Sequence, residues 1–161
     1  MSSSTETQQY TTEDTILTTN HDADSPNTNI TRVVVIAIDQ SNYSQFAFDW
    51  AVKNFLRKES DLVVLVNVRP IPMTPGPYMD FSEIIKTLED QQRQETIAMR
   101  GDARDEIVRK VSELNADGLI LGSRGLGAIK RMLLGSVSDH CIHNCHCTVI
   151  IVREQLDKKS T

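Results

Sequence analysis

The stretch Arg32-Val-Val-Val-Ile-Ala-Ile-Asp39 decides the fold. It is an unbroken apolar run of strand length, rich in β-branched residues, and it ends in a carboxylate. A half-exposed strand would alternate between polar and apolar residues, so this run predicts a parallel strand that is buried on both faces. We expect it to be the central strand of a sheet.

Strand-like and helix-like segments alternate along the chain after this run. Further strands are predicted at Leu62–Val68, Leu119–Leu121 and Thr148–Val152, because each is a short apolar run between breaks in the pattern. Helices with an apolar stripe are predicted between them, after a cap at Ser41 or Ser44, over 81–94, after a cap at Asp102, and over 136–144. Such alternation implies right-handed crossovers, so the sequence predicts a doubly wound α/β fold with a mostly parallel sheet.

Composition divides the chain into three parts. Residues 1–30 are rich in Ser, Thr, Asn and Gln and contain five acids but no Lys or Arg, which is typical of a disordered acidic tail. One folded domain is predicted over 31–154, since a chain of 161 residues fits a single core. Residues 155–161 are predicted to be a polar C-terminal tail.

Charge and cysteine usage exclude several classes of protein. The formal charge of −5 is confined to residues 1–30, because the acids and bases balance in the rest of the chain. A neutral domain argues against nucleic-acid binding through a broad basic face. The sequence shows no secretory signal and no apolar stretch of about 18 residues, so we expect a soluble, cytoplasmic protein without membrane association. Cys141, Cys145 and Cys147 are then expected to be reduced thiols.

The residues that carry chemistry are concentrated in Gly122–Ser136, whose sequence is Gly-Ser-Arg-Gly-Leu-Gly-Ala-Ile-Lys-Arg-Met-Leu-Leu-Gly-Ser. The segment follows a predicted buried strand, and doubly wound sheets bind ligands beyond the carboxyl ends of their strands. Gly122, Gly125 and Gly127 would let backbone N–H groups turn toward one anion, and Gly135 leads into a helix whose first N–H groups are unpaired. This pattern predicts a site for the phosphates of a nucleotide, although glycine-rich segments also occur as plain flexible loops.

Side chains near this segment fit the same interpretation. Arg124 and Lys130 supply positive charge, and the hydroxyls of Ser136 and Ser138 are placed to donate to phosphate oxygens. Asp39, at the end of the central strand, is placed to accept hydrogen bonds from ribose hydroxyls. A carboxylate in that position can also act only as a helix cap.

Other glycine motifs fit the segment poorly. Gly122-x4-Gly127 is followed by Ala128 and Ile129, where a P-loop requires Lys and Ser or Thr. Gly125-x-Gly127 continues to Lys130, where a dinucleotide fingerprint requires a third glycine. Gly122-Ser-Arg-Gly125 is one residue too short for the nucleophile elbow of hydrolases. The sequence therefore predicts no catalytic residues, and ATP hydrolysis that is at most slow and incidental.

The spacing Gly122-x2-Gly125-x9-Gly135-Ser136 resembles the ATP-binding pattern of the universal stress protein family. The resemblance extends over residues 32–153 and includes Val35-Ile-Ala-Ile-Asp39 and Ala116-Asp-Gly-Leu-Ile-Leu-Gly. It implies a Rossmann-like fold of the adenine nucleotide alpha hydrolase type, with a five-stranded parallel sheet in the order 3-2-1-4-5. It also implies an ATP-binding stress-response module, with or without Mg²⁺, that forms a homodimer through the strand Thr148–Val152.

The resemblance further implies a role for each residue that matches the family's motif. The adenine is expected against Ala37, Ile38 and Val68, and the ribose at Asp39. The phosphates are expected at Gly122, Arg124, Gly125, Gly135, Ser136 and Val137, with Ser138 beside them.

One segment departs from the family's pattern. A proline-rich loop at Pro70–Tyr78 is followed by only residues 81–100 for a helix, a loop and the third strand, so we expect a truncated third strand, with a stub at Thr96–Met99 on the sheet edge. If this loss spoils the adenine wall, the alternative function is a dimeric scaffold that binds no nucleotide. A nucleotide-consuming enzyme would need a second pocket, for which Pro70–Tyr78 is the candidate wall.

The cluster from His140 to Cys147 has two interpretations. Thiolates and imidazoles are good zinc ligands. However, Cys141 and Cys145 are one helical turn apart, so we expect them to face the sheet as small apolar side chains. We therefore expect no metal site.

Overall fold

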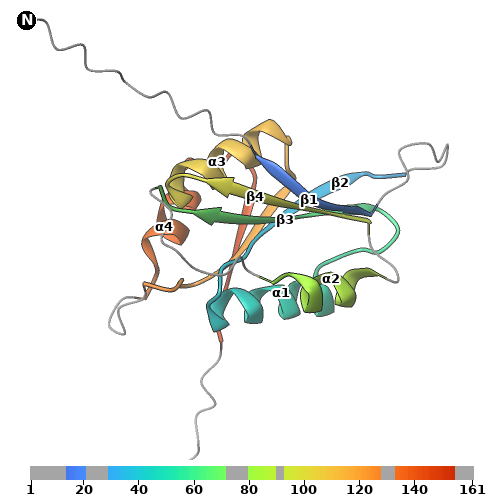
Figure 1. The fold of residues 1–161 in the computed structure, drawn as a ribbon, viewed down its shortest axis with the longest axis horizontal. Coiled ribbons are helices and arrows are strands. Elements are labelled where there is room, and N and C mark those ends of the chain that lie inside the picture. Colours follow the sequence, from blue (N-terminus) through green and yellow to red (C-terminus); the bar gives the residue numbers. More distant parts are fainter. Residues whose placement is uncertain (1–13, 21–28, 72–79, 90–92, 128–132, 155–161) are drawn as a thin grey trace, which may run out of the picture.

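A computed structural model describes residues 14–20, 29–71, 80–89, 93–127 and 133–154 (Figure 1). In chain order the elements are β1 (Thr15–Asn20), β2 (Arg32–Ala37), α1 (Asn42–Asn54), β3 (Asp61–Arg69), α2 (Ser82–Glu89), β4 (Arg93–Arg100), α3 (Ala103–Glu113), β5 (Gly118–Gly122), α4 (Ser136–Asn144) and β6 (Thr148–Val152).

The strands form one sheet in the order β1-β4-β3-β2-β5-β6. Strands β2 to β6 pair in parallel, and their spatial order is the predicted 3-2-1-4-5, so the expected doubly wound fold is confirmed. The predicted central strand, β2, pairs with β3 over its whole length and with β5 over Val34–Ile36. Its side chains from Val34 to Ile36 are fully buried, as the unbroken apolar run indicated.

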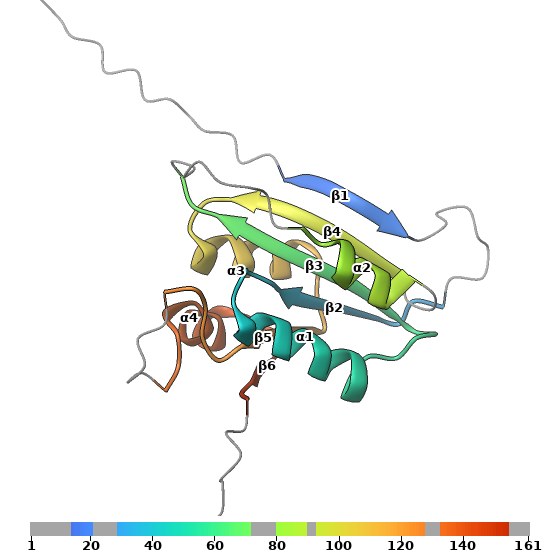
Figure 2. The same ribbon diagram turned by 60° about the horizontal axis from the view of Figure 1, so that its bottom comes forward.

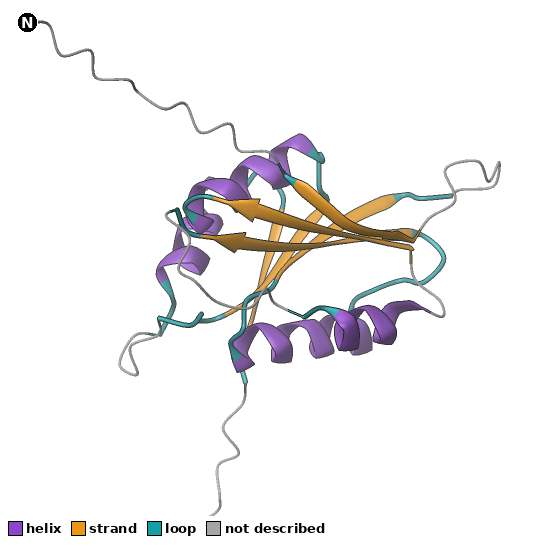
Figure 3. Cartoon of the chain, in the orientation of Figure 1, coloured by secondary structure: helices purple, strands orange, loops and turns teal. Residues whose placement is uncertain are grey.

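Helices cover both faces of the sheet (Figure 3). On one face, α1 and α2 contribute Phe48 and Ile84 to an apolar cluster that includes Ile36. On the other face, α3 and α4 contribute Ile107 and Cys141 to a second cluster. The sheet therefore has a core on each side, which explains why its central strands are apolar at consecutive positions.

Side-chain caps begin two of these helices as predicted. The Ser41 side chain accepts a hydrogen bond from the backbone N–H of Ser44 at the start of α1, and the Asp102 carboxylate accepts one from the N–H of Arg104 at the start of α3. Ser44 lies inside α1 and is not its cap. No helix in the described part of the chain is long and apolar enough to cross a membrane.

The third parallel strand differs from the prediction. Strand β4 is a full strand of eight residues rather than a stub, and α2 ends at Glu89 instead of near Gln94. Residues 93–95 are polar and have little intrinsic strand preference, but pairing with β3 along the whole of β4 holds them in the sheet. The shortening expected between 81 and 100 therefore affects the helix, not the strand.

The N-terminal segment also differs from the prediction. Residues 15–20, which composition assigned to a disordered tail, form β1 and pair with β4 in the antiparallel direction (Figure 2). Strand β4 is consequently not at the edge of the sheet. Composition could not reveal this pairing, because β1 is ordered by the unpaired backbone groups of a strand about 80 residues away.

A buried ion pair fixes the end of the sheet where β2 and β3 begin. Arg32 donates from Nε and Nη2 to the two carboxylate oxygens of Asp61, at 2.9 and 2.5 Å, and the Asp61 side chain is fully buried. Asp61 also accepts from the N–H of Arg57 at 2.8 Å, while Arg32 Nη2 donates to the carbonyl of Phe55 at 3.0 Å. This pair ties the two strands to the chain that leaves α1.

We expect Asp61→Asn to lower the free energy of unfolding by about 3 kcal/mol, because the neutral side chain leaves the largely buried guanidinium of Arg32 without its counter-charge. Urea unfolding followed by Trp50 fluorescence measures this change. Asp49→Asn is the matched control, since Asp49 is exposed and accepts only a surface hydrogen bond from Gln45. Its effect is expected to stay within about 0.5 kcal/mol, and equal losses in the two variants would contradict the assignment.

Candidate functional site

A cavity of about 350 Å³ lies at the carboxyl ends of β2 and β5. The chain leaves β2 toward α1 on one face, whereas β5 leads on to α4 on the opposite face (Figure 2). The crossovers therefore diverge between these neighbouring strands, and this divergence opens the crevice in which doubly wound sheets bind their ligands. The predicted binding residues that the structure describes line this cavity, namely Ala37, Ile38, Asp39, Val68, Gly122, Arg124, Gly125, Gly127, Gly135, Ser136, Val137 and Ser138.

One wall of the cavity is apolar. Strand residues supply Ala37, Val66 and Val68, and the first turns of α3 supply Ala103 and Ile107. The part of the chain that is described places no charged side chain in this wall. It offers a surface for a flat, weakly polar group.

The glycines of the opposite wall are required by close packing. A Cβ atom at Gly122 would lie 2.7 Å from the backbone carbonyl of Tyr43, and one at Gly125 would lie 2.8 Å from a carboxylate oxygen of Asp39. A Cβ at Gly135 would lie 3.2 Å from the Cα of Arg124. Any larger residue at Gly122 or Gly125 would push these segments apart, so the same glycines that shape the cavity also close the fold around it.

Asp39 connects the central strand to the glycine-rich loop. Its Oδ1 atom accepts from the backbone N–H of Ser41 at 2.9 Å and from the Ser41 hydroxyl, and its Oδ2 atom accepts from the N–H of Leu126 at 3.2 Å. The carboxylate is half-buried and lines the cavity. It therefore supports the start of α1 and holds the loop while it presents an acceptor to the cavity.

The N-terminus of α4 points into the cavity. Gly135 is the N-cap residue, and it has no side chain that could accept hydrogen bonds from the first N–H groups of the helix. The first two residues of the helix, Ser136 and Val137, line the cavity. Unpaired N–H groups and the positive end of the helix dipole together favour an anion here. The Ser138 hydroxyl donates to the carbonyl of Gly122 at 2.8 Å. Its single hydrogen therefore holds α4 against β5, and the donation expected from Ser138 to a phosphate would require this bond to break.

Arg124 is the cation of the cavity wall among the described residues. Its guanidinium lies 5.9 Å from the ring centroid of Tyr43, which places it beside the start of α1. Lys130, the second predicted source of positive charge, lies outside the described residues.

Sequence reasoning missed several residues of the lining. They are Ser44, Val66, Ala103, Ile107, Leu121 and Leu126, whereas Gly127, which was predicted, also lines the cavity. Two of them had a readable signal, because Val66 is two residues before the predicted Val68 and Leu121 directly precedes Gly122. The contribution of α3 had none, since only the tertiary structure brings Ala103 beside the central strands.

The cysteine cluster packs in the core near α4. Cys141 is fully buried, Cys145 and Cys147 are half-buried beside it, and all three are free thiols. Burial raises the pKa of Cys141 to about 12, so this thiol stays protonated at neutral pH. Within the described ranges no three His, Cys, Asp or Glu side chains gather in a way that could hold a metal ion.

The fold and the cavity define a doubly wound α/β protein with a glycine-lined crevice at the carboxyl edge of its sheet. Residues 31–153 match the model of the universal stress protein family, and the chain belongs to this family.

Individual relatives agree with this assignment. Universal stress protein PHOS34 of Arabidopsis thaliana is 31% identical in an alignment 173 residues long, gaps included. The alignment covers 83% of this chain and 66% of the relative. Universal stress protein YxiE of Bacillus subtilis is 29% identical, with 74% of this chain and 97% of the relative covered. The chain thus spans about two thirds of the length of PHOS34.

Solved structures share the fold at lower identity. The structure of the protein MJ0577 has a TM-score of 0.66 at 20% identity and covers 78% of this chain and 98% of its own. An Arabidopsis thaliana universal stress protein with AMP bound has a TM-score of 0.56 at 21% identity, covering 81% and 96%. A universal stress protein in complex with cAMP has a TM-score of 0.57 at 23% identity, covering 75% and 95%.

We expect Gly122→Ala to lower the free energy of unfolding by about 1–3 kcal/mol, because the added methyl group would overlap the backbone of Tyr43. Gly127→Ala is the matched control, since a Cβ there meets no atom within 4 Å. Chemical denaturation of the two variants measures the difference. A Gly122→Ala protein as stable as the Gly127→Ala protein would show that β5 does not pack against α1 as described.

Proposed function

We propose that this protein is an ATP-binding universal stress protein in which the cavity at the ends of β2 and β5 holds the nucleotide. The observation that carries the proposal is that one cavity combines an apolar wall, a carboxylate and an uncapped helix N-terminus beside an arginine. These are the surfaces that a base, a sugar and a phosphate chain require, in that order.

Each part of the nucleotide has a proposed partner. The adenine packs on the apolar wall formed by Ala37, Val68 and Ile107, where burial of its faces supplies most of the affinity. The ribose hydroxyls donate to Asp39, which exchanges or shares its bond with the Leu126 N–H. The phosphates lie at the α4 N-terminus, near Arg124.

Structural relatives support a nucleotide as the ligand. Two of them have AMP or cAMP bound, as stated above, which makes an adenine nucleotide the first class to test. The choice of ATP, with or without Mg²⁺, rests on the glycine spacing from 122 to 136, which resembles the ATP-binding pattern of the family.

Binding rather than catalysis is the proposed role. Among the described lining residues no His, Cys or Lys faces the cavity, and the hydroxyls of Ser44 and Ser138 already donate to backbone carbonyls. A nucleophile with an adjacent base would be needed for acyl or phosphoryl transfer to a protein group. Nucleotide occupancy would instead alter the affinity for a partner in a stress response.

A homodimer through β6 and a cytoplasmic location belong to the same proposal. Strand β6 pairs with β5 on one side and forms the outer strand of the described sheet on the other, so its free edge can pair with a second copy. Three free thiols are in keeping with a reducing compartment. Sedimentation velocity with and without ATP tests the dimer.

The alternative function, a scaffold that binds no nucleotide, assumed a truncated third strand that spoils the adenine wall. The eight residues of β4 argue against that assumption and favour nucleotide binding. The wall considered for a nucleotide-consuming enzyme, Pro70–Tyr78, lies largely outside the described residues.

Gly135→Asp is expected to weaken ATP binding at least tenfold, which corresponds to about 1.4 kcal/mol, since a carboxylate at the α4 N-terminus repels phosphate. Gly135 has φ −73° and ψ 156°, a conformation that any residue adopts, and aspartate is a good N-cap. The added Cβ would lie 3.2 Å from the Cα of Arg124, so the backbone must shift by a few tenths of an ångström, equally in the Asp and Asn variants. Isothermal titration calorimetry, with and without Mg²⁺, measures the affinity.

Gly135→Asn is the matched control, because asparagine has the same shape without the charge and is expected to retain most of the affinity. Absence of binding by the parent protein at millimolar ATP would overturn the proposal. Equal affinity of the Asp and Asn variants would place the phosphates elsewhere.

A further inference from the structure

Strand β1 lies outside the range of the chain that matches the family model. The family model begins at residue 31, and β1 precedes it. Among the described pairs of strands, β1–β4 is the antiparallel one, with Thr15 opposite Ala98 and Asn20 opposite Gln94. The edge that β4 would otherwise expose is therefore filled by a segment from outside the domain (Figure 2).

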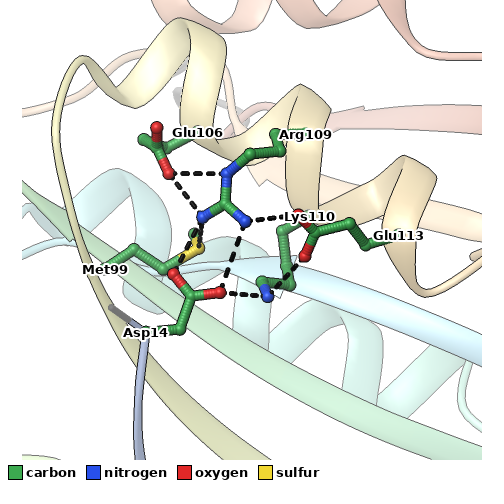
Figure 4. Close-up of polar contacts among 6 residues, drawn as sticks. All are labelled: Asp14, Met99, Glu106, Arg109, Lys110 and Glu113. Carbon is green, nitrogen blue, oxygen red and sulfur yellow. Dashed lines mark hydrogen bonds and ion pairs between the residues drawn. The ribbon is translucent and has the colours of Figure 1, made fainter. Parts of the chain in front are cut away.

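An ionic cluster anchors the beginning of this strand. Asp14 directly precedes β1, and its Oδ1 atom accepts from Arg109 Nη2 at 2.8 Å while Oδ2 pairs with Lys110 Nζ (Figure 4). Both cations come from α3, which follows β4 in the chain. The carboxylate of Asp14 and the ammonium of Lys110 are largely buried, with exposed fractions of 18% and 9%. This cluster gives the edge of β4 a polar end that selects for a carboxylate.

Burial alone would raise the pKa of Asp14, but the hydrogen bonds from Arg109 and Lys110 outweigh it and lower the pKa below the usual 3.8. Asp14 contributes stability above its unfolded pKa and loses it as the pH falls through the lowered value. At neutral pH the cluster is therefore fully ionised.

The cations of α3 also have partners of their own. Arg109 Nη2 lies 2.5 Å from Glu106, and Arg109 Nη1 and Lys110 Nζ lie 2.5 and 2.8 Å from the two oxygens of Glu113. Two cations and two acids of α3 thus remain paired if Asp14 leaves. When β1 leaves, the carboxylate of Asp14 returns to water, and Arg109 and Lys110 keep the acids of α3 as partners. No buried charge is left without a counter-charge, so β1 can detach.

The first two side chains of β1 contribute little apolar burial. Thr15 and Ile16 are exposed, with 59% of Ile16 accessible, and neither apolar cluster includes a described residue of β1. On β4, the side-chain oxygens of Gln94 and Thr96 are buried and have no hydrogen-bond partner among the described side chains; in register these two residues lie opposite Asn20 and Thr18. Backbone pairing along β1 and the ionic cluster at its start are thus two interactions that attach the strand.

We propose that the outer edge of β4, with Arg109 and Lys110 at its end, is a strand-binding site that residues 14–20 of a second copy fill when two chains exchange their N-terminal strands. The segment that fits this edge in backbone pairing and in charge is the chain's own. Residues 21–31 connect β1 to β2 and span at most about 40 Å when extended, whereas the six residues of β1 extend over about 20 Å, so the connection is long enough to let β1 leave the β4 of its own chain. Exchange of an identical element is a low-cost route to a dimer.

The site is tested first in the full chain by hydrogen exchange. Asp14→Lys places a cation against Arg109 and Lys110, so the β4 amides that face β1 are expected to exchange at least tenfold faster, with the amides of β2 unchanged. Asp49→Lys, the same charge change on the opposite face of the sheet, is expected to leave β4 unchanged. A synthetic peptide of residues 13–20 should then restore protection of β4 in the Asp14→Lys chain. A peptide with Asn in place of its aspartate should need at least tenfold higher concentration.

Exchange between copies is tested by mixing two full-length variants. In Asp14→Lys the strand is repelled and the site is intact, whereas in Arg109→Glu the strand is intact and the site repels it. Mixing is expected to produce more hetero-complex than either variant forms with a tagged copy of itself, and to restore protection of β4. Pairing through β6 is equal in all of these mixtures, so it cancels in the comparison.

No protection of β4 by millimolar peptide, equal protection by the two peptides, or no excess of hetero-complex would overturn the proposal. Altered exchange in β2 would show that a variant disturbs the whole fold. In that case the peptide of residues 13–20 is added to the parent chain, where it should compete with the chain's own strand for β4, and absence of competition at millimolar peptide would overturn the proposal. The outcome is independent of nucleotide binding, because the strand-binding site lies at the opposite edge of the sheet from β6 and shares no residue with the cavity.

Discussion

The parallel pairing of β2 with β3 on one side and with β5 on the other is the constraint on which the rest of the structure depends. Both neighbours run in the same direction, so the chain must cross over a face of the sheet each time it returns. Crossovers of one handedness that start on opposite sides of β2 place α1 and α4 on opposite faces. The gap left between them is the cavity, which Asp39 lines directly after β2 and Gly122 lines at the end of β5.

Close packing and the proposed nucleotide recognition use the same residues in this cavity. Gly122 allows β5 to approach Tyr43, and Gly125 allows the loop to approach Asp39, whose carboxylate bonds both the start of α1 and the loop. A bound ligand that engages Asp39 must therefore act on the loop as well. This arrangement links occupancy of the cavity to the surface around Leu126, which is exposed.

The two edges of the sheet are treated differently. At β6 the outer edge has no partner strand among the described residues, whereas at β4 the strand β1 pairs with the edge and an ionic cluster anchors it. An unpaired edge is a template for another strand, which is the reason for the two interactions between copies proposed above. The N-terminal strand β1 covers the edge of β4.

The sequence by itself determined the parallel core, the strand order through the family resemblance, and the part of the cavity lining that comes from β2 and the glycine-rich segment. Runs such as Arg32–Ile38 and the spacing from Gly122 to Ser136 are local signals, because burial on both faces and the absence of Cβ atoms act residue by residue. Only the tertiary structure decided that residues 93–95 are a strand, that residues 15–20 join the sheet, and that α3 supplies a wall of the cavity. These features come from backbone pairing and contacts between segments far apart in the chain. A polar segment leaves no periodic signal when its order depends on a partner strand's unpaired backbone groups and on Arg109 and Lys110.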